Sequence, residues 1–414
     1  MAEVACVSEP LQAYVQESSS TDLVKARLAS IDAYRGLVMF LMLAEVLRFC
    51  VVPDAWPGLV VWRFLCDQQT HAAWTGCSLH DLIQPGFFFL VGVVLPFSIA
   101  RRQSSGQTFS SIVRHAVTRS LILVVLGMVL IAVHPRRWIW WFGDTLTQIG
   151  LAYTFLLLLG YCPARDRWIA FGVILLGYWM WFALAPLPGT DFDYAMVGVP
   201  ADWLKEHGLT GFAAHWQKNS NPAYLFDLWF LNLFPRETPY LGDRTGLTTL
   251  NFIPSIGTML LGLAAGDVLR SARSPWGKVR WLSIAGIVML SGGWLLGAVG
   301  ICPVVKAIWT PSWVFFSGGW CCLFLAAFYA LVDICGMQWL VFPLIMIGAN
   351  STFAYSISHI FPAFAFHSLD RVFGKGIFRV FGDVYEPTVY GAAVLLVYWL
   401  ILFGLYWRKI FLRI

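Results

Sequence analysis

Charged side chains are scarce in this chain of 414 residues. Asp, Glu, Lys and Arg together make up 12% of it, whereas hydrophobic residues make up 58%. A soluble domain carries about 25% charged residues, so this composition excludes an ordinary soluble protein and predicts one embedded in a lipid bilayer. The 21 Trp and 14 Tyr residues suit the two membrane–water interfaces, where amphipathic rings lie at headgroup depth.

Three further absences narrow the possible functions. The formal net charge is +5, but the basic residues are scattered between apolar runs and form no patch with interleaved aromatics, which argues against nucleic-acid binding. No His or Cys spacing is typical of a metal site, so we expect no metal. We also find no internal repeat and no inverted symmetry of the kind that transporters often show.

The nine cysteines are odd in number, and most lie inside apolar runs, where Cys behaves as a small hydrophobic residue. Cys66 and Cys77 instead lie together in one polar loop. A disulfide between them would require that loop to face an oxidising compartment, and the sequence leaves this question open.

A helix that spans a bilayer needs about 20 mainly apolar residues. Ten stretches meet this requirement and predict an all-α polytopic membrane protein with one long extracytoplasmic loop over residues 187–249. Residues 1–26 are polar and lack the apolar core of a signal peptide, so we predict a cytoplasmic tail there and a membrane domain over residues 27–414. The predicted spans are 31–50, 82–100, 116–133, 144–161, 168–186, 250–269, 281–301, 312–332, 339–361 and 388–407.

The orientation of these spans follows from the basic residues in the short loops. Most of the Arg and Lys residues in the short loops follow the spans that end near residues 100, 161, 269 and 407, although Arg136 and Arg137 depart from this pattern. The positive-inside rule then predicts that both termini lie in the cytoplasm. We expect a multi-pass protein of the inner membrane. His71 and the 187–249 interval would lie on the opposite, extracytoplasmic side.

Residues 70–92 place several polar groups at the start of an apolar run. A single loop His is usually an ordinary surface residue, but here His71 is followed closely by Trp74, His80 and Asp81. An imidazole can act as nucleophile or general base near neutral pH, and a carboxylate can fix its tautomer. Asp81 also has a structural explanation, because Ser78-x-x-Asp81 matches a capping box. His80 is a candidate second base or substrate-binding residue.

Glu45 lies about 14 residues into the first predicted span, towards the outer leaflet. A carboxylate without a partner in hydrocarbon costs several kcal/mol, so Glu45 should face the bundle interior and find a partner. Arg48, one helical turn later, is the simpler partner, and His71 is the functionally interesting one. Asp32 and Arg35, three residues apart, can form a structural pair near the cytoplasmic boundary.

Other polar residues have two interpretations each. Gln148, Asn251 and Asn350 lie inside spans, where helix–helix hydrogen bonding is their commoner role, and lining of a cavity is the alternative. In the 187–249 interval, Trp216 and Asp227 belong to a stretch rich in aromatic and planar polar side chains, which commonly bind sugars. The alternative is a folded loop that only caps the bundle.

Several blocks resemble the transmembrane acyltransferases related to heparan-alpha-glucosaminide N-acetyltransferase. The most specific block is His71-Ala-Ala-Trp74-Thr-Gly76-x-x-x-x-Asp81-Leu-Ile-x-Pro85. The other similar blocks are Arg27-Leu-x-Ser30-x-Asp32-x-Tyr34-Arg35-Gly36, Leu146-x-Gln148-Ile-Gly150-x-x-Tyr153, Leu250-Asn251 and Asn350-Ser351-x-x-x-Tyr355. The short polar N-terminal segment resembles a bacterial-type member.

This resemblance implies an enzyme that takes an acetyl group from cytoplasmic acetyl-CoA and delivers it to an amino sugar or glycan across the membrane. His71 would be the catalytic His, with Asp81 as the acid that follows it. Glu45 is a departure, since the animal enzyme has an Asn near this point, and we count Glu45 as a third catalytic candidate. The resemblance also implies a homodimer.

Binding residues are expected on both sides of the bilayer. The substrate-binding candidates are Trp74, His80, Asn251, Asn350, Trp216 and Asp227. The acetyl-CoA-binding candidates are Arg35, Arg101, Arg102 and Gln148, although topogenic roles explain Arg101 and Arg102 equally well.

Two mechanisms and two other function classes stay open. His71 can accept the acetyl group in a ping-pong route, or it can act as general base while acetyl-CoA is bound. The alternative functions are a transporter or flippase of a glycan or small polar solute, and a purely structural membrane subunit. A transporter should show discontinuous helices in two related halves, and a structural subunit would not explain His71, Asp81 and Glu45 together.

Overall fold

The computed structural model describes residues 28–133 and 138–411. The predicted cytoplasmic tail over residues 1–26, together with Arg27, Arg136, Arg137 and Arg413, lies outside these ranges. The described chain is almost entirely helical. Its α-helices are α2 (Ala29–Leu43), α3 (Val51–Ala55), α4 (Val60–Gln69), α5 (Ile83–Ser104), α6 (Phe109–Val133), α7 (Thr145–Gly160), α8 (Ala164–Ala183), α9 (Ala201–His207), α10 (Pro222–Phe230), α11 (Phe252–Arg270), α12 (Pro275–Ala298), α13 (Pro311–Phe328), α14 (Phe342–Ala349), α15 (Ser351–Ile360), α16 (Pro362–Phe373) and α17 (Glu386–Trp407).

Seven stretches of the described chain are long and apolar enough to cross a membrane. They are Ala29–Ala55, His80–Ser104, Phe109–Val133, Thr249–Arg270, Pro275–Ala298, Pro311–Ile334 and Asp383–Trp407. These coincide with seven of the ten predicted spans. Of the other three, α7 has 16 residues, α8 is not among the seven, and the predicted span 339–361 is divided into α14 and α15 at Asn350. The prediction of an all-α membrane protein is supported, but its count of ten spans is not confirmed.

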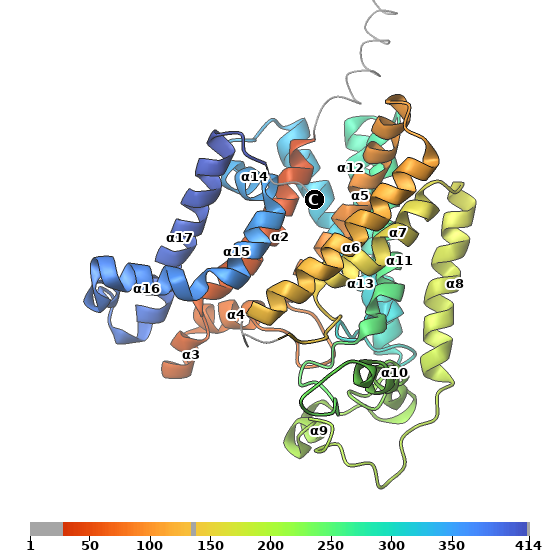
Figure 1. The fold of residues 1–414 in the computed structure, drawn as a ribbon, viewed down its shortest axis with the longest axis horizontal. Helices are drawn as coiled ribbons and strands as arrows, with labels where there is room; N and C mark the ends of the chain where they lie inside the picture. The colour runs from red at the N-terminus through yellow and green to blue at the C-terminus, as the bar shows by residue number, and fades with distance from the viewer. Residues whose placement is uncertain (1–27, 134–137, 412–414) are drawn as a thin grey trace, which may run out of the picture.

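Glycines allow the central helices to approach each other closely (Figure 1). A methyl group on Gly92 of α5 would lie 2.0 Å from the Met259 carbonyl oxygen of α11, and one on Gly262 of α11 would lie 2.0 Å from that of Phe89. Small residues drive helix association in membranes by this kind of backbone contact. A similar contact joins Gly348 of α14 to the Asp32 carbonyl of α2. The close packing fixes the position of α5 (Ile83–Ser104), and the loop that carries His71 leads directly into this helix.

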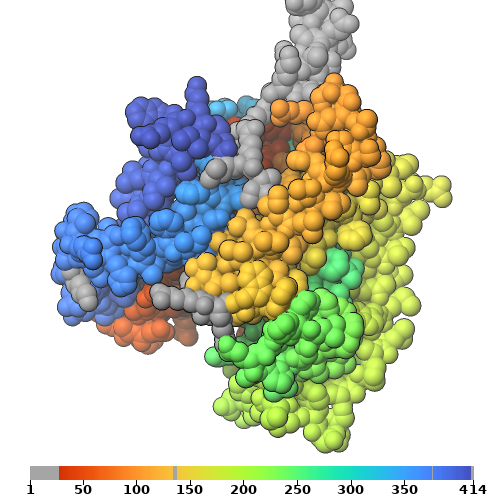
Figure 2. Space-filling view, in the orientation of Figure 1, coloured from red at the N-terminus to blue at the C-terminus, as the bar shows by residue number. Residues whose placement is uncertain are grey.

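The interval between α8 and α11 folds over one end of the bundle, where α5, α11 and α13 begin (Figures 1 and 2). Within it, the Asn221 side chain caps α10 by accepting a hydrogen bond from the Tyr224 amide at 3.1 Å. Trp216 is completely buried, and its ring stacks on that of Phe182 in α8. The interval is therefore a folded cap, as one of the two interpretations proposed.

A disulfide at this same end joins Cys50 to Cys66. The pairing considered from the sequence, Cys66 with Cys77, is wrong, because Cys50 lies beyond the end of α2 and not inside a continuous apolar helix. Cys77 is a free cysteine. The bond ties the turn that follows α2 to α4, the helix that leads directly to His71.

Candidate active site

The loop that carries His71 is anchored where α5 begins. Ser78 and Asp81 form the predicted capping box: the Asp81 Oδ2 atom accepts a hydrogen bond from the Ser78 amide at 3.1 Å, and the Ser78 hydroxyl accepts one from the Asp81 amide at 3.3 Å. The same Oδ2 atom accepts a bond from the Ala72 amide at 3.0 Å. These bonds satisfy free amides at a helix start and fix both ends of the loop.

The other oxygen of the same carboxylate orients His71. The Asp81 Oδ1 atom lies 2.7 Å from His71 Nδ1 and 3.1 Å from the Lys306 ammonium. Asp81 is buried, whereas the His71 ring is 57% exposed. The structure thus brings together two of the three predicted catalytic residues, and Asp81 is cap and orienting group at once.

The hydrogen-bond partners indicate which nitrogen of His71 carries the proton. The His71 Nδ1 atom has two contacts, the Asp81 Oδ1 atom at 2.7 Å and the Lys306 ammonium at 3.1 Å. A carboxylate can only accept, so we assign the proton to Nδ1 on the shorter contact, and the ammonium then donates to Asp81 Oδ1 at 3.1 Å. The Nε2 atom then carries a lone pair, and it has no hydrogen-bond partner among the described residues. Partial burial lowers the pKa of His71, and the Lys306 ammonium lowers it further against the opposing effect of Asp81. A neutral imidazole with a free Nε2 can serve as nucleophile or base.

Lys306 reaches the site from the loop between α12 and α13. The Gly76 amide donates to the Val304 carbonyl at 3.0 Å, and Thr75 and Val305 form a β-bridge, so the two loops are held side by side. Sequence reasoning missed Lys306. A signal was present, because this Lys lies in a short loop on the side of the bundle that the positive-inside rule leaves poor in basic residues.

Glu45 pairs with His80 and not with either partner predicted for it. The Glu45 Oε1 atom lies 2.9 Å from His80 Nε2, while the Arg48 guanidinium lies over the Phe366 ring. The physical reason is that α2 ends at Leu43, and Arg48 adopts a left-handed backbone conformation with a φ of 49°. The carboxylate therefore lies in a turn beyond the helix, with 58% of its side chain exposed to the cavity.

Gln69 supports that turn from the end of α4. Its side-chain amide donates to the Ala44 carbonyl at 2.6 Å and accepts from the Phe49 amide at 2.9 Å. These two bonds replace helical hydrogen bonds that are lost where α2 ends. Together with the disulfide, they hold Glu45 against the loop of His71.

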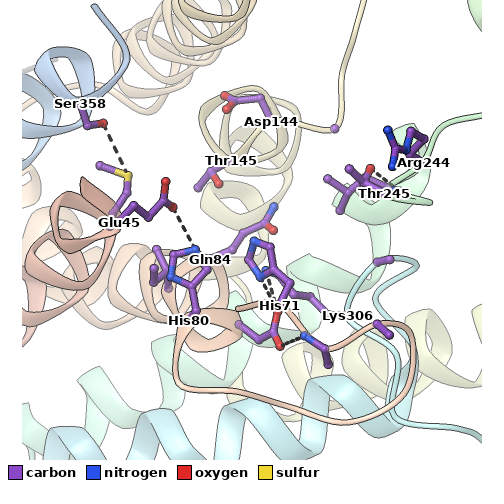
Figure 3. A pocket seen from close by; sticks show the side chains of 18 of the residues that line it. Glu45, His71, His80, Gln84, Asp144, Thr145, Arg244, Thr245, Lys306 and Ser358 are labelled. Atoms are coloured by element: carbon purple, nitrogen blue, oxygen red, sulfur yellow. Dashed lines mark hydrogen bonds and ion pairs between the residues drawn. The ribbon is translucent and has the colours of Figure 1, made fainter. Parts of the chain in front are cut away.

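Glu45, His71, His80 and Asp81 line one cavity of about 920 Å³ (Figure 3). The His71 and His80 rings are in contact, with centroids 4.5 Å apart. The opposite walls come from three elements and carry polar groups as well. They include Asp144 and Thr145 before and in α7, Tyr355, Ser358 and His359 of α15, and Trp203, Lys218, Arg244 and Thr245 of the cap.

Of the predicted substrate-binding residues, Trp74 and His80 line this cavity. Trp216 lies directly behind Trp74, whose indole N–H donates to the Trp216 carbonyl at 3.1 Å. Asp227 is buried in the cap and accepts a hydrogen bond from the Thr249 amide at 2.9 Å, and burial raises the pKa of its carboxyl to about 6. A substrate-binding role for Trp216 and Asp227 stays a prediction.

Three amides within the apolar helices hold backbone carbonyls and do not line the cavity. Asn251 donates to the Ala307 carbonyl at 2.7 Å, Asn350 to the Ile410 carbonyl at 3.0 Å, and Gln148 to the Thr249 carbonyl at 2.9 Å. These contacts are structural, but the acceptor carbonyls lie in segments beside the α-helices and not within them, so they are not the helix–helix bonds that the sequence predicted. Asn251 contributes to the site indirectly, because its hydrogen bond holds the backbone of Ala307, the residue next to Lys306.

The candidate acetyl-CoA ligands lie away from the cavity. Arg101 and Arg102 are at the last turn of α5, a 22-residue helix, and so about 33 Å from its start. Arg35 contacts Asp32 at 3.2 Å, as the spacing predicted. A role of these arginines in binding acetyl-CoA stays a prediction.

Cys77, although close to Asp81, is a poor nucleophile. Burial, reinforced by the Asp81 charge, raises the pKa of its thiol to about 12. The reactive form of cysteine is the thiolate, which is therefore scarce at neutral pH. This leaves the imidazole of His71 as the better nucleophile at the site.

Comparison with known proteins agrees with the resemblance carried by the motifs. No protein-family model matches the chain. The chain is 24% identical to heparan-alpha-glucosaminide N-acetyltransferase of Homo sapiens over 404 residues, which cover 86% of this chain and 56% of the human protein. It is also 24% identical to the Mus musculus protein of the same name over 389 residues, or 84% and 55% of the two chains. These matches support a relationship to that family. The chain spans about half the length of these curated relatives.

We predict that Asp81→Ala lowers the free energy of unfolding by about 3–5 kcal/mol, because it leaves the buried Lys306 ammonium without its carboxylate partner and removes the cap of α5. Thermal unfolding in detergent measures this effect. Combining Asp81→Asn with Lys306→Met should cost less than the sum of the two single changes.

The matched control is Asp267→Asn, which breaks a 2.7 Å pair with Arg167 whose carboxylate is 44% exposed. Such exposed pairs contribute about 1 kcal/mol or less. Equal losses for Asp267→Asn and Asp81→Ala would contradict the special role of Asp81.

Proposed function

We propose that this protein is a membrane acetyltransferase that moves an acetyl group from cytoplasmic acetyl-CoA to an amino sugar or glycan on the extracytoplasmic side. The observation that carries the proposal is the His71 Nε2 atom, which is left free by the contact with Asp81 and lies at a cavity of about 920 Å³. The similarity to proteins named N-acetyltransferases, over 86% of the chain, supports the reaction class.

The geometry supports two routes for the transfer. In the first, His71 Nε2 attacks the thioester carbonyl, the C–S bond breaks, and the acetyl group stays on the imidazole until the amine takes it. In the second, His71 Nε2 removes a proton from the acceptor amine while the amine attacks the thioester directly. In both routes the imidazole gains positive charge, which the Asp81 carboxylate stabilises at 2.7 Å.

Two observations support an extracytoplasmic position of the cavity. The disulfide between Cys50 and Cys66 lies at its side of the bundle, and disulfides persist in oxidising compartments. At the other end of the bundle, arginines lie at or next to the helix ends, as the positive-inside rule requires for the cytoplasmic side. They are Arg101, Arg102, Arg165, Arg167, Arg270 and Arg273. The proposed enzyme is thus a multi-pass inner-membrane protein; a homodimer stays a prediction.

His71→Ala should abolish transfer of labelled acetyl from acetyl-CoA to glucosamine in proteoliposomes, because it removes the only nitrogen that we assign to the acetyl group. The control is His115→Ala, which changes an exposed imidazole on α6 at the other end of the bundle. Equal product formation by His71→Ala and wild type would refute the assignment. Labelled protein trapped from wild type but not from His71→Ala would favour the ping-pong route.

The pH profile of the reaction should reflect the lowered pKa of His71. The neutral imidazole is the active form, so activity falls as the pH drops through that pKa, and the acidic limb lies below about pH 6.5. Lys306→Met removes a cation that lowers this pKa, and the limb should therefore move to higher pH. Lys306→Arg keeps the charge and should leave the limb in place. An identical limb in wild type and Lys306→Met would contradict this account.

Thiol labelling tests the proposed sidedness. In intact cells, a membrane-impermeant maleimide should label Cys50 and Cys66 only after reduction of their disulfide, because both lie on the outside. Cys335, an exposed free thiol at the other end of α13, is the matched control and should stay unlabelled until the membrane is opened. Labelling of Cys335 in intact cells would show that the topology is inverted.

A further inference from the structure

The proposed transfer leaves one proton without an assigned acceptor. An amino sugar is largely an ammonium ion near neutral pH, and an ammonium has no lone pair with which to attack a carbonyl. His71 cannot take this proton in the ping-pong route, because its free nitrogen then carries the acetyl group. A second base near His71 is needed on the acceptor side of the cavity.

The pair formed by Glu45 and His80 has the geometry of such a base. The Glu45 Oε1 atom contacts His80 Nε2 at 2.9 Å, and the second carboxylate oxygen has no partner in the described chain. Figure 3 shows that oxygen directed away from His80 and into the cavity. His80 is buried and holds one side of Glu45 in place, while the other side can reach a ligand.

The same His80 ring also contacts His71, with ring centroids 4.5 Å apart. Glu45 and His71 are therefore separated by no more than one imidazole ring and its two contacts. A sugar amine placed beside Glu45 would lie close to an acetyl group on His71. The arrangement forms two carboxylate–imidazole pairs, Asp81 with His71 and Glu45 with His80, in contact through their rings.

Other ionisable groups face Glu45 from the surrounding elements. They are His71 on the same loop as His80, His359 and Tyr355 on α15, and Lys306 from the loop between α12 and α13. Three carboxylates line the cavity, those of Glu45, Asp81 and Asp144, and among them Glu45 is the one that is exposed and has one oxygen without a partner in the described chain. Asp81 is buried with both oxygens occupied, and Asp144 caps α7 and accepts a hydrogen bond from Tyr355.

We infer that Glu45, held in place by His80, is the base that deprotonates the acceptor ammonium. This inference rests on the proposed function and assigns it a second catalytic residue that touches the substrate. His80 is a positioning residue, because it acts through Glu45.

The acceptor nitrogen loses two protons during the transfer. The acceptor R–NH₃⁺ gives one proton to the free Glu45 oxygen and becomes R–NH₂. The nitrogen lone pair attacks the acetyl carbonyl, a C–N bond forms, and the bond from that carbon to His71 Nε2 or to the thioester sulfur breaks. The second proton lost by the nitrogen passes to His71 Nε2, which is the departing group in the ping-pong route and the base in the direct route. In the direct route His71 then gives this proton to the departing thiolate. Water in the cavity removes the proton from Glu45 and, in the ping-pong route, the proton from His71.

The test compares two acceptors of different basicity at pH 6, in proteoliposomes with labelled acetyl-CoA. Glucosamine is protonated at this pH and needs the base, whereas O-methylhydroxylamine is already neutral and does not. General-base catalysis contributes about 10²–10⁴-fold. Glu45→Gln should therefore lower the rate towards glucosamine by about 100-fold or more, but lower the rate towards O-methylhydroxylamine by less than about 10-fold. His80→Gln should show the same selectivity with a smaller loss.

Controls separate this role from a structural one. Glu206→Gln changes another Glu–His contact, with His207 at 3.8 Å, on the exposed helix α9, and should affect neither acceptor. Thermal unfolding of each variant shows that the protein is folded. Equal losses for both acceptors in Glu45→Gln, or no loss for either, would overturn the inference while leaving the acetyltransferase intact. A wild-type protein that acetylates neither acceptor would overturn the proposed function itself.

Discussion

The buried carboxylate of Asp81 is the group on which the rest of the site depends. One oxygen closes the cap at the start of α5, and the other contacts both the His71 imidazole and the Lys306 ammonium. A charge in this position is costly without partners, and here each partner is also a part of the site. The helix start, the imidazole tautomer and the position of a distant loop are therefore fixed by one side chain, and a change there cannot be confined to catalysis.

A second set of contacts joins the first helix to this centre. The disulfide between Cys50 and Cys66 and the two hydrogen bonds of Gln69 hold the turn beyond α2 against α4. Glu45 lies in that turn and contacts His80 at 2.9 Å. The backbone contacts through Gly92 and Gly262 keep α5 in a fixed place beneath both pairs. Rigid helices thus position a site whose reactive groups all lie in turns and loops.

Much of this arrangement could be predicted from the sequence, because the strongest signals are local. Apolar runs placed the helices, and Ser78-x-x-Asp81 indicated the cap that the structure confirms. The contact between His71 and Asp81 was expected from ten residues of sequence. The motifs also indicated the relatives that the comparison found.

The errors have two physical causes: the position at which a helix ends, and contacts between residues far apart in the chain. Arg48 was a reasonable partner for Glu45 only if α2 continued, but the helix ends at Leu43. Cys50 was assigned to an apolar span for the same reason, so its bond to Cys66 was missed. Lys306 contacts a residue 225 positions away, and no local pattern carries that information.

This long separation has a consequence for biosynthesis. Ribosomes make the chain from its N-terminus, so Asp81 and His71 enter the membrane well before Lys306 has been translated. During that interval the carboxylate has its cap and its imidazole but not its ammonium. The Lys306 ammonium can contact Asp81 only after the α12–α13 loop has been made and has reached the site. A chain that stalls before Lys306 would therefore hold the Asp81 carboxylate without the ammonium that contacts it in the complete protein.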